Sequence, residues 1–386
     1  MTVSLPLVPS GSNQVASAYR DRRRNVEINV GKACNNKCVF CLDGMPKKED
    51  QRFIDFDVMR AELERWYREG HRSVGFLGGE PTMYPRIADS IRHARDLGYT
   101  RIALATNAMM FRRMRFVDQL IDAGLSRVTI SMHGHTRELE DRLTDVPGAF
   151  DKKCEALANL RRRRDEGALK DGLSVNIVLN GWNYLKLPRM MKFFFEVQDL
   201  ADLRVNFVRP EGYAEGSHDL TPTYTEVMPV LMKAILLNEY HFRRVFTFGG
   251  VPLCVLPDEL LHSKRLLAKY CGDVYRDLST DCSIYSDGVS EGVSQVEGGR
   301  ARFNWQDRKR FDLKPKVEAC RRCDALHLCE GVWGGYQDIY GSVEVSPLHV
   351  VDGKMQREAP RLAAPPRPSD IEPARPLPHR LKLIDG

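Results

Sequence analysis

The sequence lacks any long apolar run. Its 386 residues contain no segment of roughly 18 consecutive apolar residues, so no transmembrane helix is predicted. The N-terminus also lacks the basic region followed by an apolar stretch that is typical of a secretion signal. We therefore predict a cytoplasmic protein with no membrane partner. Because the cytosol keeps thiols reduced, the ten cysteines are interpreted as metal ligands rather than disulfides.

A strong excess of one charge is also missing. The 58 Lys and Arg residues against 52 Asp and Glu give a net charge of only +6. Two basic runs, at 22–24 and 161–164, are not interleaved with the aromatic side chains on which single-stranded nucleic acids stack. We interpret both runs as solvated faces. A nucleic-acid partner is therefore not expected, and RNA is the minority alternative.

Three cysteines stand close together near the start of the chain. Cys34, Cys38 and Cys41 occupy the run Cys-Asn-Asn-Lys-Cys-Val-Phe-Cys. A [4Fe–4S] cluster held by protein alone needs four cysteines. A group of three therefore predicts a cluster with one iron open to an exogenous ligand, as catalytic metal sites keep a position free. The alternative is a zinc knuckle that takes a histidine as its fourth ligand.

Between residues 27 and 208 the chain alternates β-rich and helix-patterned segments. This pattern is typical of parallel strands joined by crossover helices. The helix before residue 98 shows it best, with Ile87, Ile91, Ala94 and Leu97 at helical spacing and Gly98 just beyond the end. Six such units predict an α/β fold that forms an open, partial barrel. The expected strands are 27–31, 73–77, 101–105, 127–131, 173–179 and 203–208.

Short motifs follow the predicted strands in order. Gly78-Gly79-Glu80-Pro81 follows the second strand, Thr106-Asn107 ends the third and Ser131 ends the fourth. Together with the cysteine run, in which Phe40 precedes the last cysteine, this set resembles the catalytic core of the radical S-adenosylmethionine (SAM) superfamily. The resemblance covers residues 30 to about 210. In that family SAM chelates the open iron of the cluster.

The resemblance implies a partial (βα)6 radical SAM barrel with its site at the carboxyl ends of the strands. Cys34, Cys38 and Cys41 would hold the [4Fe–4S] cluster, and Glu80 would accept a hydrogen bond from the SAM amino group. Taken singly, the glycine motif could be a turn and Thr106-Asn107 a helix cap. The implied cofactor-binding residues are Phe40, Gly78, Gly79, Glu80, Thr106, Asn107, Ser131, Asn176 and Arg209. His133 and His135 are either acid–base candidates or ordinary loop histidines.

A second group of cysteines lies in the C-terminal part of the chain. The spacing of Cys320, Cys323 and Cys329 resembles the auxiliary-cluster extension called SPASM or twitch. Trp333 stands where the full pattern has a further cysteine, and Leu266 where it has a glycine, which argues against two auxiliary clusters. We expect one auxiliary [4Fe–4S] cluster, with structural zinc as the rival. The candidates for its fourth ligand are Cys254, then Cys271 and Cys282. Cys154, which shares a helical face with Leu157, is interpreted as a small buried hydrophobe.

Four regions are expected along the chain. They are an N-terminal extension at 1–24, the radical SAM partial barrel at 25–238, a small cysteine-rich auxiliary-cluster domain at 239–350 and a Pro-rich tail at 351–386. Glycines between Ser286 and Phe303 predict hairpin turns inside the third region.

The expected reaction is reductive cleavage of SAM to a 5′-deoxyadenosyl radical that abstracts hydrogen from a substrate carbon. The auxiliary cluster would accept the remaining electron or hold the substrate. The resemblance implies a peptide substrate, with a sugar or nucleotide as one alternative and a non-catalytic sensor as another. A flavodoxin or ferredoxin is the expected electron donor. The 33 residues before Cys34 are too few for a leader-binding domain, so a leader would need either a separate leader-binding protein or another surface of this chain.

Overall fold

A computed structural model gives the structure of the protein. It describes residues 24–43, 52–271, 280–285, 295–297 and 300–358. The predicted N-terminal extension lies outside the described residues except for Arg24, and so do the four glycines at 288, 292, 298 and 299.

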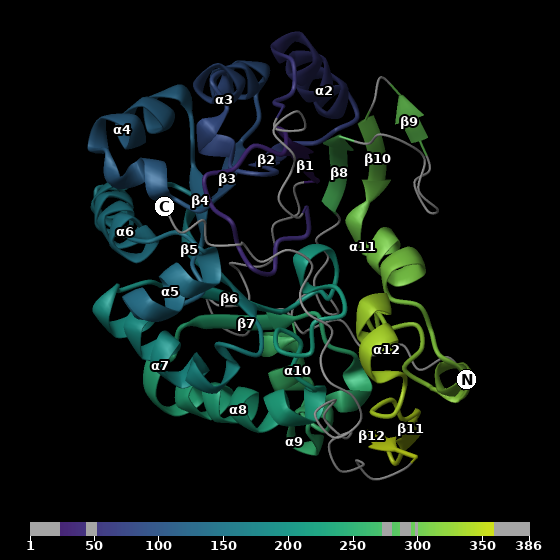
Figure 1. Ribbon diagram of the computed structural model, residues 1–386. Coiled ribbons are helices and arrows are strands. Elements are labelled where there is room, and N and C mark those ends of the chain that lie inside the picture. Colours follow the sequence, from purple (N-terminus) through teal and green to yellow (C-terminus); the bar gives the residue numbers. More distant parts are fainter. Residues whose placement is uncertain (1–23, 44–51, 272–279, 286–294, 298–299, 359–386) are drawn as a thin grey trace, which may run out of the picture.

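One large sheet organises the molecule (Figure 1). It has ten strands in the order β7-β6-β5-β4-β3-β2-β1-β8-β10-β9, and a separate hairpin, β11–β12, follows it. All neighbours from β7 to β8 are parallel, whereas β10 is antiparallel to both β8 and β9. The strands are β1 Asn25–Asn29, β2 Ser73–Leu77, β3 Arg101–Thr106, β4 Arg127–Ser131, β5 Gly172–Leu179, β6 Asp202–Phe207, β7 Val245–Gly249, β8 Thr280–Tyr285, β9 Gln295–Glu297, β10 Arg300–Asn304, β11 Leu348–Val351 and β12 Lys354–Arg357.

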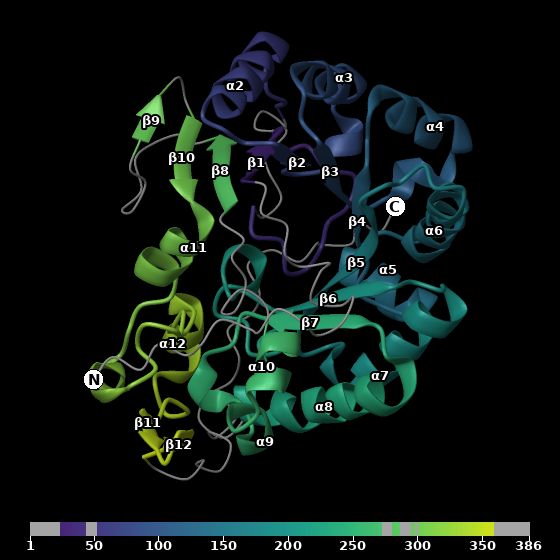
Figure 2. The same ribbon diagram turned by 180° about the vertical axis from the view of Figure 1, so that it is seen from behind.

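Helices cover one face of this curved sheet, as Figures 1 and 2 show from opposite sides. None of the helices in the described residues combines the length and apolar character needed to cross a bilayer. The helices are α2 Phe56–Arg68, α3 Ile87–Leu97, α4 Met114–Ala123, α5 Arg137–Thr144, α6 Ala149–Asp165, α7 Leu187–Lys192, α8 Tyr224–Leu237, α9 Asp258–Leu261, α10 Lys264–Tyr270, α11 Trp305–Arg308 and α12 Gly334–Tyr340.

The two faces of the sheet differ in chemistry. Val74, Val128 and Val175 are fully buried and belong to the hydrophobic core shared with the helices. On the opposite face Ala105 and Asn206 remain exposed although they lie within strands. The helix-free inner face is therefore lined by small and polar side chains and is accessible to solvent, which suits a substrate-binding surface.

Local sequence explains where the crossover helices begin and end. Helix α3 stops at Gly98, whose positive φ of 102° ends the helix without a Cβ penalty. Helix α8 begins with a capping box, in which the Thr223 hydroxyl accepts from the Glu226 amide and the Glu226 carboxylate accepts from the Thr223 amide. The predicted helix over 87–97 is confirmed.

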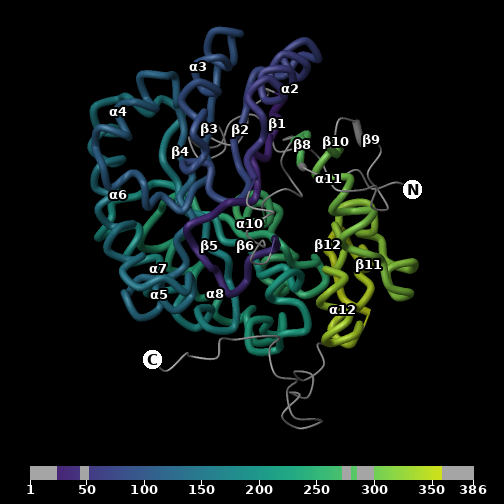
Figure 3. Tube along the Cα trace, turned by 45° about the horizontal axis from the view of Figure 1, so that its top comes forward, coloured from purple at the N-terminus to yellow at the C-terminus, as the bar shows by residue number. Residues whose placement is uncertain are grey.

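The C-terminal part of the chain extends the same sheet. Strand β8 pairs with β1 in parallel, from Asn25 opposite Thr280 to Ile28 opposite Ser283. Beyond β10, helices α11 and α12 and the β11–β12 hairpin lie along one side of the barrel (Figure 3). Their apolar side chains, including Trp333 and Leu348, join the barrel core in a single cluster.

The predicted α/β fold with six parallel strands is confirmed, and the first strand begins two residues earlier than expected, at Asn25 rather than 27. The sequence did not predict β7, which lies beyond the expected barrel boundary at 238. Strands β7 to β10 lie in the region predicted as a separate domain, yet they continue the main sheet. Strand β12 also shows that the chain is folded beyond 351, where the tail was placed.

A buried ion pair attaches β10 to helix α2. Glu62 is 3% exposed and accepts hydrogen bonds from Ser283 Oγ at 2.6 Å and Arg302 Nε at 3.2 Å. Trp66 Nε1 also donates to the Glu62 carboxylate, at 3.3 Å. Removing one partner of a buried pair leaves the other charge uncompensated, which is more costly than losing a surface pair.

We predict that Glu62→Gln lowers the free energy of unfolding by about 3–5 kcal/mol, because it leaves Arg302 buried without its carboxylate. Urea titration of the apoprotein measures this change. The matched control is Glu69→Gln at the C-cap of the same helix, whose exposed pair with Arg65 contributes less than about 1 kcal/mol. Equal effects of the two substitutions would contradict the proposed attachment.

Candidate iron–sulfur and cofactor site

The predicted site residues gather at the carboxyl ends of the parallel strands. Cys34, Cys38 and Cys41 lie in the loop after β1, Gly78–Glu80 follow β2, and Asn107 follows β3. Adjacent strands place these loops side by side because the sheet order is β3-β2-β1. In α/β barrels this end of the sheet forms the active face.

The two glycines after β2 allow the cysteine loop to approach the strand. A Cβ on Gly79 would lie 2.3 Å from the Ala33 carbonyl oxygen, and one on Gly78 would lie 2.6 Å from the Gly31 oxygen. The amides of Gly79 and Glu80 donate to the Gly31 and Ala33 carbonyls at 2.8 and 2.7 Å. Here the glycines make room for protein backbone, and Gly78 also needs its positive φ of 109°.

Glu80 holds the next loop in place. Its carboxylate is 1% exposed and accepts from Thr106 Oγ1 at 2.6 Å, from the Asn107 amide at 2.7 Å and from the amide and hydroxyl of Thr82. Burial raises the pKa of Glu80, and these donated hydrogen bonds oppose that rise. Three of these donors share Oε1, whereas Oε2 accepts only from the Asn107 amide, so Glu80 positions residues 106–107 and its contact with SAM stays a prediction.

Asn107, held by Glu80, in turn contacts the cysteine loop. Its Nδ2 donates to Asn35 Oδ1 at 2.6 Å and lies 3.9 Å from Cys34 Sγ. The Asn36 amide also donates to Cys34 Sγ at 3.4 Å, and Asn36 Nδ2 lies 3.9 Å from Cys38 Sγ. Asn36 inside the loop and Asn107 outside it thus contact thiols, a role that the cysteine spacing alone did not predict.

Phe40, in the cysteine loop, packs against His133. Their rings meet edge to face with centroids 4.8 Å apart, and His133 Nδ1 accepts from the Val178 amide at 3.0 Å. Burial and then the charge of Lys153 hold the pKa of His133 well below its usual range, so the ring stays neutral. His133 therefore supports the loop, and His135 is only partly buried nearby.

The three remaining predicted residues lie farther along the sheet. Ser131 stands opposite Asn176 in the β4–β5 pairing, and Asn176 Oδ1 accepts from Asn206 at 2.7 Å on the inner face. Arg209, after β6, pairs with Glu211 and lies over the Trp333 ring, 5.3 Å from its centroid. Arg209 thus faces the C-terminal extension.

Burial makes two thiols of the first group weak acids. It raises the pKa of Cys34 to about 11 and that of Cys38 to about 12. Metal binding would remove their protons, since the thiolate is the ligand form. With Cys41 the loop carries three cysteines, which fits a cluster that leaves one iron open.

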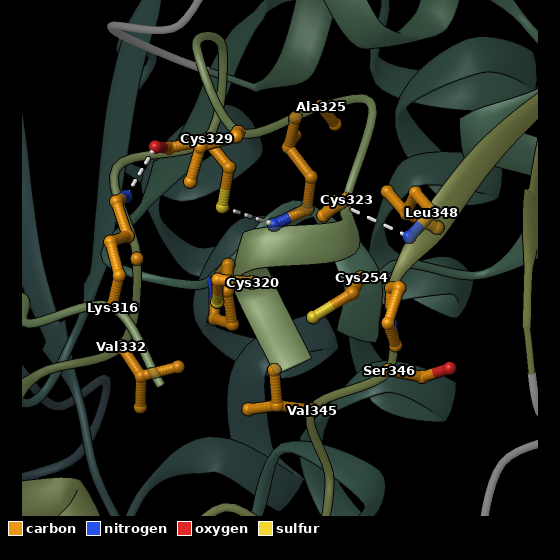
Figure 4. Close-up of a pocket in the computed structure, with 15 residues that line it drawn as sticks. Cys254, Lys316, Cys320, Cys323, Ala325, Cys329, Val332, Val345, Ser346 and Leu348 are labelled. Atoms are coloured by element: carbon orange, nitrogen blue, oxygen red, sulfur yellow. Dashed lines mark hydrogen bonds between the residues drawn. The ribbon is translucent and has the colours of Figure 1, made fainter. Parts of the chain in front are cut away.

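Four cysteines of the second group line one pocket in the C-terminal extension (Figure 4). They are Cys254, from the turn after β7, and Cys320, Cys323 and Cys329. The pocket wall is otherwise largely apolar, with Leu253, Val332 and Val345 among its residues. Of the three candidates for a fourth ligand, the structure brings Cys254 to the other cysteines.

Backbone amides point at these sulfurs. The Leu253 amide donates to Cys329 Sγ at 3.4 Å and the Leu348 amide to Cys323 Sγ at 3.3 Å. Burial raises the pKa of Cys254 to about 12, and a hydrogen bond from the Ser346 backbone opposes this rise. Amide donors to cysteine sulfur are a feature of iron–sulfur sites, where they tune the cluster potential.

The other cysteines lie elsewhere. Cys271 ends α10, Cys282 stands opposite Glu27 in the β1–β8 pairing, and Cys154 is half-buried on α6 against the core. None of the three lines the pocket with Cys254. Within the described residues, no three Cys, His, Asp or Glu side chains are grouped closely enough to hold a single metal ion.

Solved structures share this architecture. Streptococcus suis SuiB bound to S-adenosylmethionine aligns with 82% of this chain and 74% of its own, with a TM-score of 0.55 and 18% identity. The structure of anSMEcpe with AdoMet and the Cp18Cys peptide covers the same 82% and 90% of its own chain, with a TM-score of 0.56 and 17% identity. At these identities the likeness establishes the fold class, a partial α/β barrel with a C-terminal extension.

Sequence comparisons find a radical SAM domain. Residues 28–194 match the model of the Radical SAM superfamily, so the chain carries a radical SAM domain, followed by a cysteine-rich extension. The PqqA peptide cyclase of Bradyrhizobium diazoefficiens is 29% identical over 359 residues, which cover 86% of this chain and 90% of the relative. A probable GTP 3′,8-cyclase of Metallosphaera sedula is 26% identical over 230 residues, or 58% of this chain and 68% of the relative.

We predict that Gly79→Ala displaces the cysteine loop, because its Cβ would overlap the Lys32 and Ala33 carbonyls. After anaerobic reconstitution, bound iron should fall by about four atoms per chain, which colorimetric iron analysis measures. Gly75→Ala, within β2 and before this motif, is the control, since its Cβ would meet only ordinary contacts, the nearest at 3.5 Å. A Gly79→Ala protein with full iron content would show that the loop tolerates the displacement.

Proposed function

We propose that the protein is a radical SAM enzyme with two [4Fe–4S] clusters that modifies a peptide. Cys34, Cys38 and Cys41 would hold the cluster to which SAM binds. Cys254, Cys320, Cys323 and Cys329 would hold the auxiliary cluster. When bound and reduced, the first cluster and SAM supply a 5′-deoxyadenosyl radical that removes hydrogen from a substrate carbon.

The observation that carries this proposal is the closed set of contacts around Cys34. The Gly78–Gly79 edge fixes the loop backbone, Glu80 fixes Asn107, and Asn107 returns to Asn35 and Cys34. These contacts would hold a bound cofactor in a fixed orientation. Orienting the cofactor is the protein's contribution when the cofactor itself supplies the chemistry. The open inner face of the sheet would receive the substrate.

The loop after β6 suggests where the substrate lies. The Tyr213 amide donates to the Cys41 carbonyl at 3.0 Å, and a Cβ on Gly335 would lie 2.0 Å from the Pro210 oxygen. The loop therefore contacts the first cysteine group on one side and α12 on the other. It carries Arg209 beside Trp333, which is four residues beyond Cys329.

Two buried donors at this junction lack acceptors in the described residues. They are Arg209 Nε and Trp333 Nε1. Both groups only donate hydrogen bonds, and an unpaired buried donor costs about 1–3 kcal/mol. A peptide carbonyl bound between the two cysteine groups would supply the missing acceptor.

The extent of the sequence matches favours a peptide over a nucleotide. The peptide cyclase relative matches 86% of the chain, whereas the GTP cyclase relative matches 58%. The nucleotide alternative stays as the second candidate because several such relatives match more than half of the chain. A flavodoxin or ferredoxin donor, a separate leader-binding protein and a cytoplasmic location belong to the proposal.

We expect the anaerobically reconstituted protein, given SAM and dithionite, to release 5′-deoxyadenosine. Replacing Cys34 with Ala should reduce the yield to that of a reaction without enzyme, as measured by liquid chromatography. Cys154→Ala, a half-buried cysteine outside both groups, should leave the yield unchanged. Protein that binds SAM yet releases no 5′-deoxyadenosine, with candidate peptides and nucleotides present, would refute the proposal.

Cys254→Ser should lower the iron content from about eight atoms per chain to about four, because it removes one ligand of the second cluster. Iron and sulfide analysis measures this, and zinc analysis distinguishes the rival metal. Cys271→Ser, also buried but outside the pocket, should keep about eight irons. The assignment of Cys254 is wrong if the two variants exchange these outcomes.

A further inference from the structure

A buried ion pair lies beneath the first cysteine loop. Lys153, on α6, and Glu140, on α5, are both fully buried, and Lys153 Nζ lies 2.5 Å from Glu140 Oε1. Lys153 also donates to the Ser131 carbonyl at 2.8 Å. The second carboxylate oxygen of Glu140 accepts from the amides of His133 and Gly134 at 2.7 and 2.6 Å.

Helix α5, which carries Glu140, is hydrogen-bonded to the backbone around Cys38. The amides on either side of Cys38, those of Lys37 and Val39, donate to the Thr144 and Leu143 carbonyls at 2.9 and 3.0 Å. Those carbonyls form the last turn of α5, one turn beyond Glu140. Cys38 therefore lies above the negative end of a helix, which by itself would disfavour further negative charge there.

Stability does not explain a fully buried pair well. Taking two charges out of water costs several kcal/mol for each ion, and well-packed apolar residues often serve as well or better. A reduced iron–sulfur cluster gains negative charge, and a nearby fixed cation stabilises that state. The position of Lys153 therefore suits a functional role in reduction.

We propose that Lys153 is a positioning residue that sets the reduction potential of the cluster held at Cys38, by keeping a fixed positive charge beneath it. This inference rests on the proposed function. The packing agrees: Phe40 of the cysteine loop packs against His133, whose amide is held by Glu140, the partner of Lys153. Burial raises the pKa of Cys38, and the charge of Lys153 opposes that rise.

The test replaces both members of the ion pair, so that the positive charge of Lys153 is removed and no unpaired charge stays buried. Lys153→Met alone would leave the Glu140 carboxylate buried without a cation and could unfold the protein, so the informative variant is the double substitution Lys153→Met with Glu140→Gln. A glutamine oxygen can still accept from the amides of His133 and Gly134, and its amide group would lie beside the Ser131 carbonyl. Lys152→Met, on the same helix but only partly buried, is the control.

The measurement is a redox titration of the reconstituted holoprotein by electron paramagnetic resonance, following the signal that SAM perturbs. At a fixed potential we expect about a tenfold lower ratio of reduced to oxidised cluster in the double variant, a shift of about 59 mV to more negative potential for a one-electron couple. Iron content and SAM binding should match the wild type, and Lys152→Met should not shift the potential.

An unchanged potential in the double variant would overturn the inference and leave the proposed function intact. An equal shift in Lys152→Met would also overturn it, because any surface charge would then suffice. A wild-type protein without a SAM-responsive signal would refute the proposed function, and the inference would fail with it.

Discussion

The architecture of the site depends on one close contact, between the backbone after β1 and the two glycines after β2. At Gly79 no side chain atom fits, since a Cβ would lie 2.3 Å from the Ala33 oxygen. The contact places Cys34 immediately beyond the fixed segment and turns the Glu80 carboxylate inward. From there hydrogen bonds lead through Asn107 back to the cysteine loop. Loss of clearance at Gly79 would therefore disturb the cysteine loop and the groups hydrogen-bonded to it.

The C-terminal extension is held to the barrel by the same continuous core. Strand β8 pairs with β1, Glu62 on α2 binds Arg302 on β10, and the side chains around Trp333 pack with those of the barrel. The loop that carries Arg209 touches the Cys41 backbone on one side and α12 on the other. The relative placement of the two cysteine groups is thus built into one folded unit, as electron exchange with a substrate between them would require.

Local patterns explain which parts of this fold the sequence could predict. The six parallel strands and the α3 boundaries follow from periodicity and capping residues that lie next to each other in the chain. The pairing of β1 with β8 joins Asn25 to Thr280, and no local pattern signals a partner so far away. The cysteine spacing predicted both groups, but only folding brings Cys254, rather than Cys271 or Cys282, to the pocket.

The roles of charged residues were least predictable. A carboxylate in a Gly-Gly-Glu-Pro motif gives no sign that four internal donors already use it, and Lys153 and Glu140 look like ordinary surface residues, since charged side chains are rarely fully buried. Yet buried cations recur beside the cysteines. Lys153 opposes the rise in the pKa of Cys38, while Lys314 is buried with Glu330, and burial lowers the pKa of Lys314 although Cys329 nearby opposes this. Thiolate-held clusters carry negative charge, so a buried cation near each group offsets charge where water cannot. Both lysines are also paired with buried carboxylates, so each would offset cluster charge in addition to holding its neighbours in place.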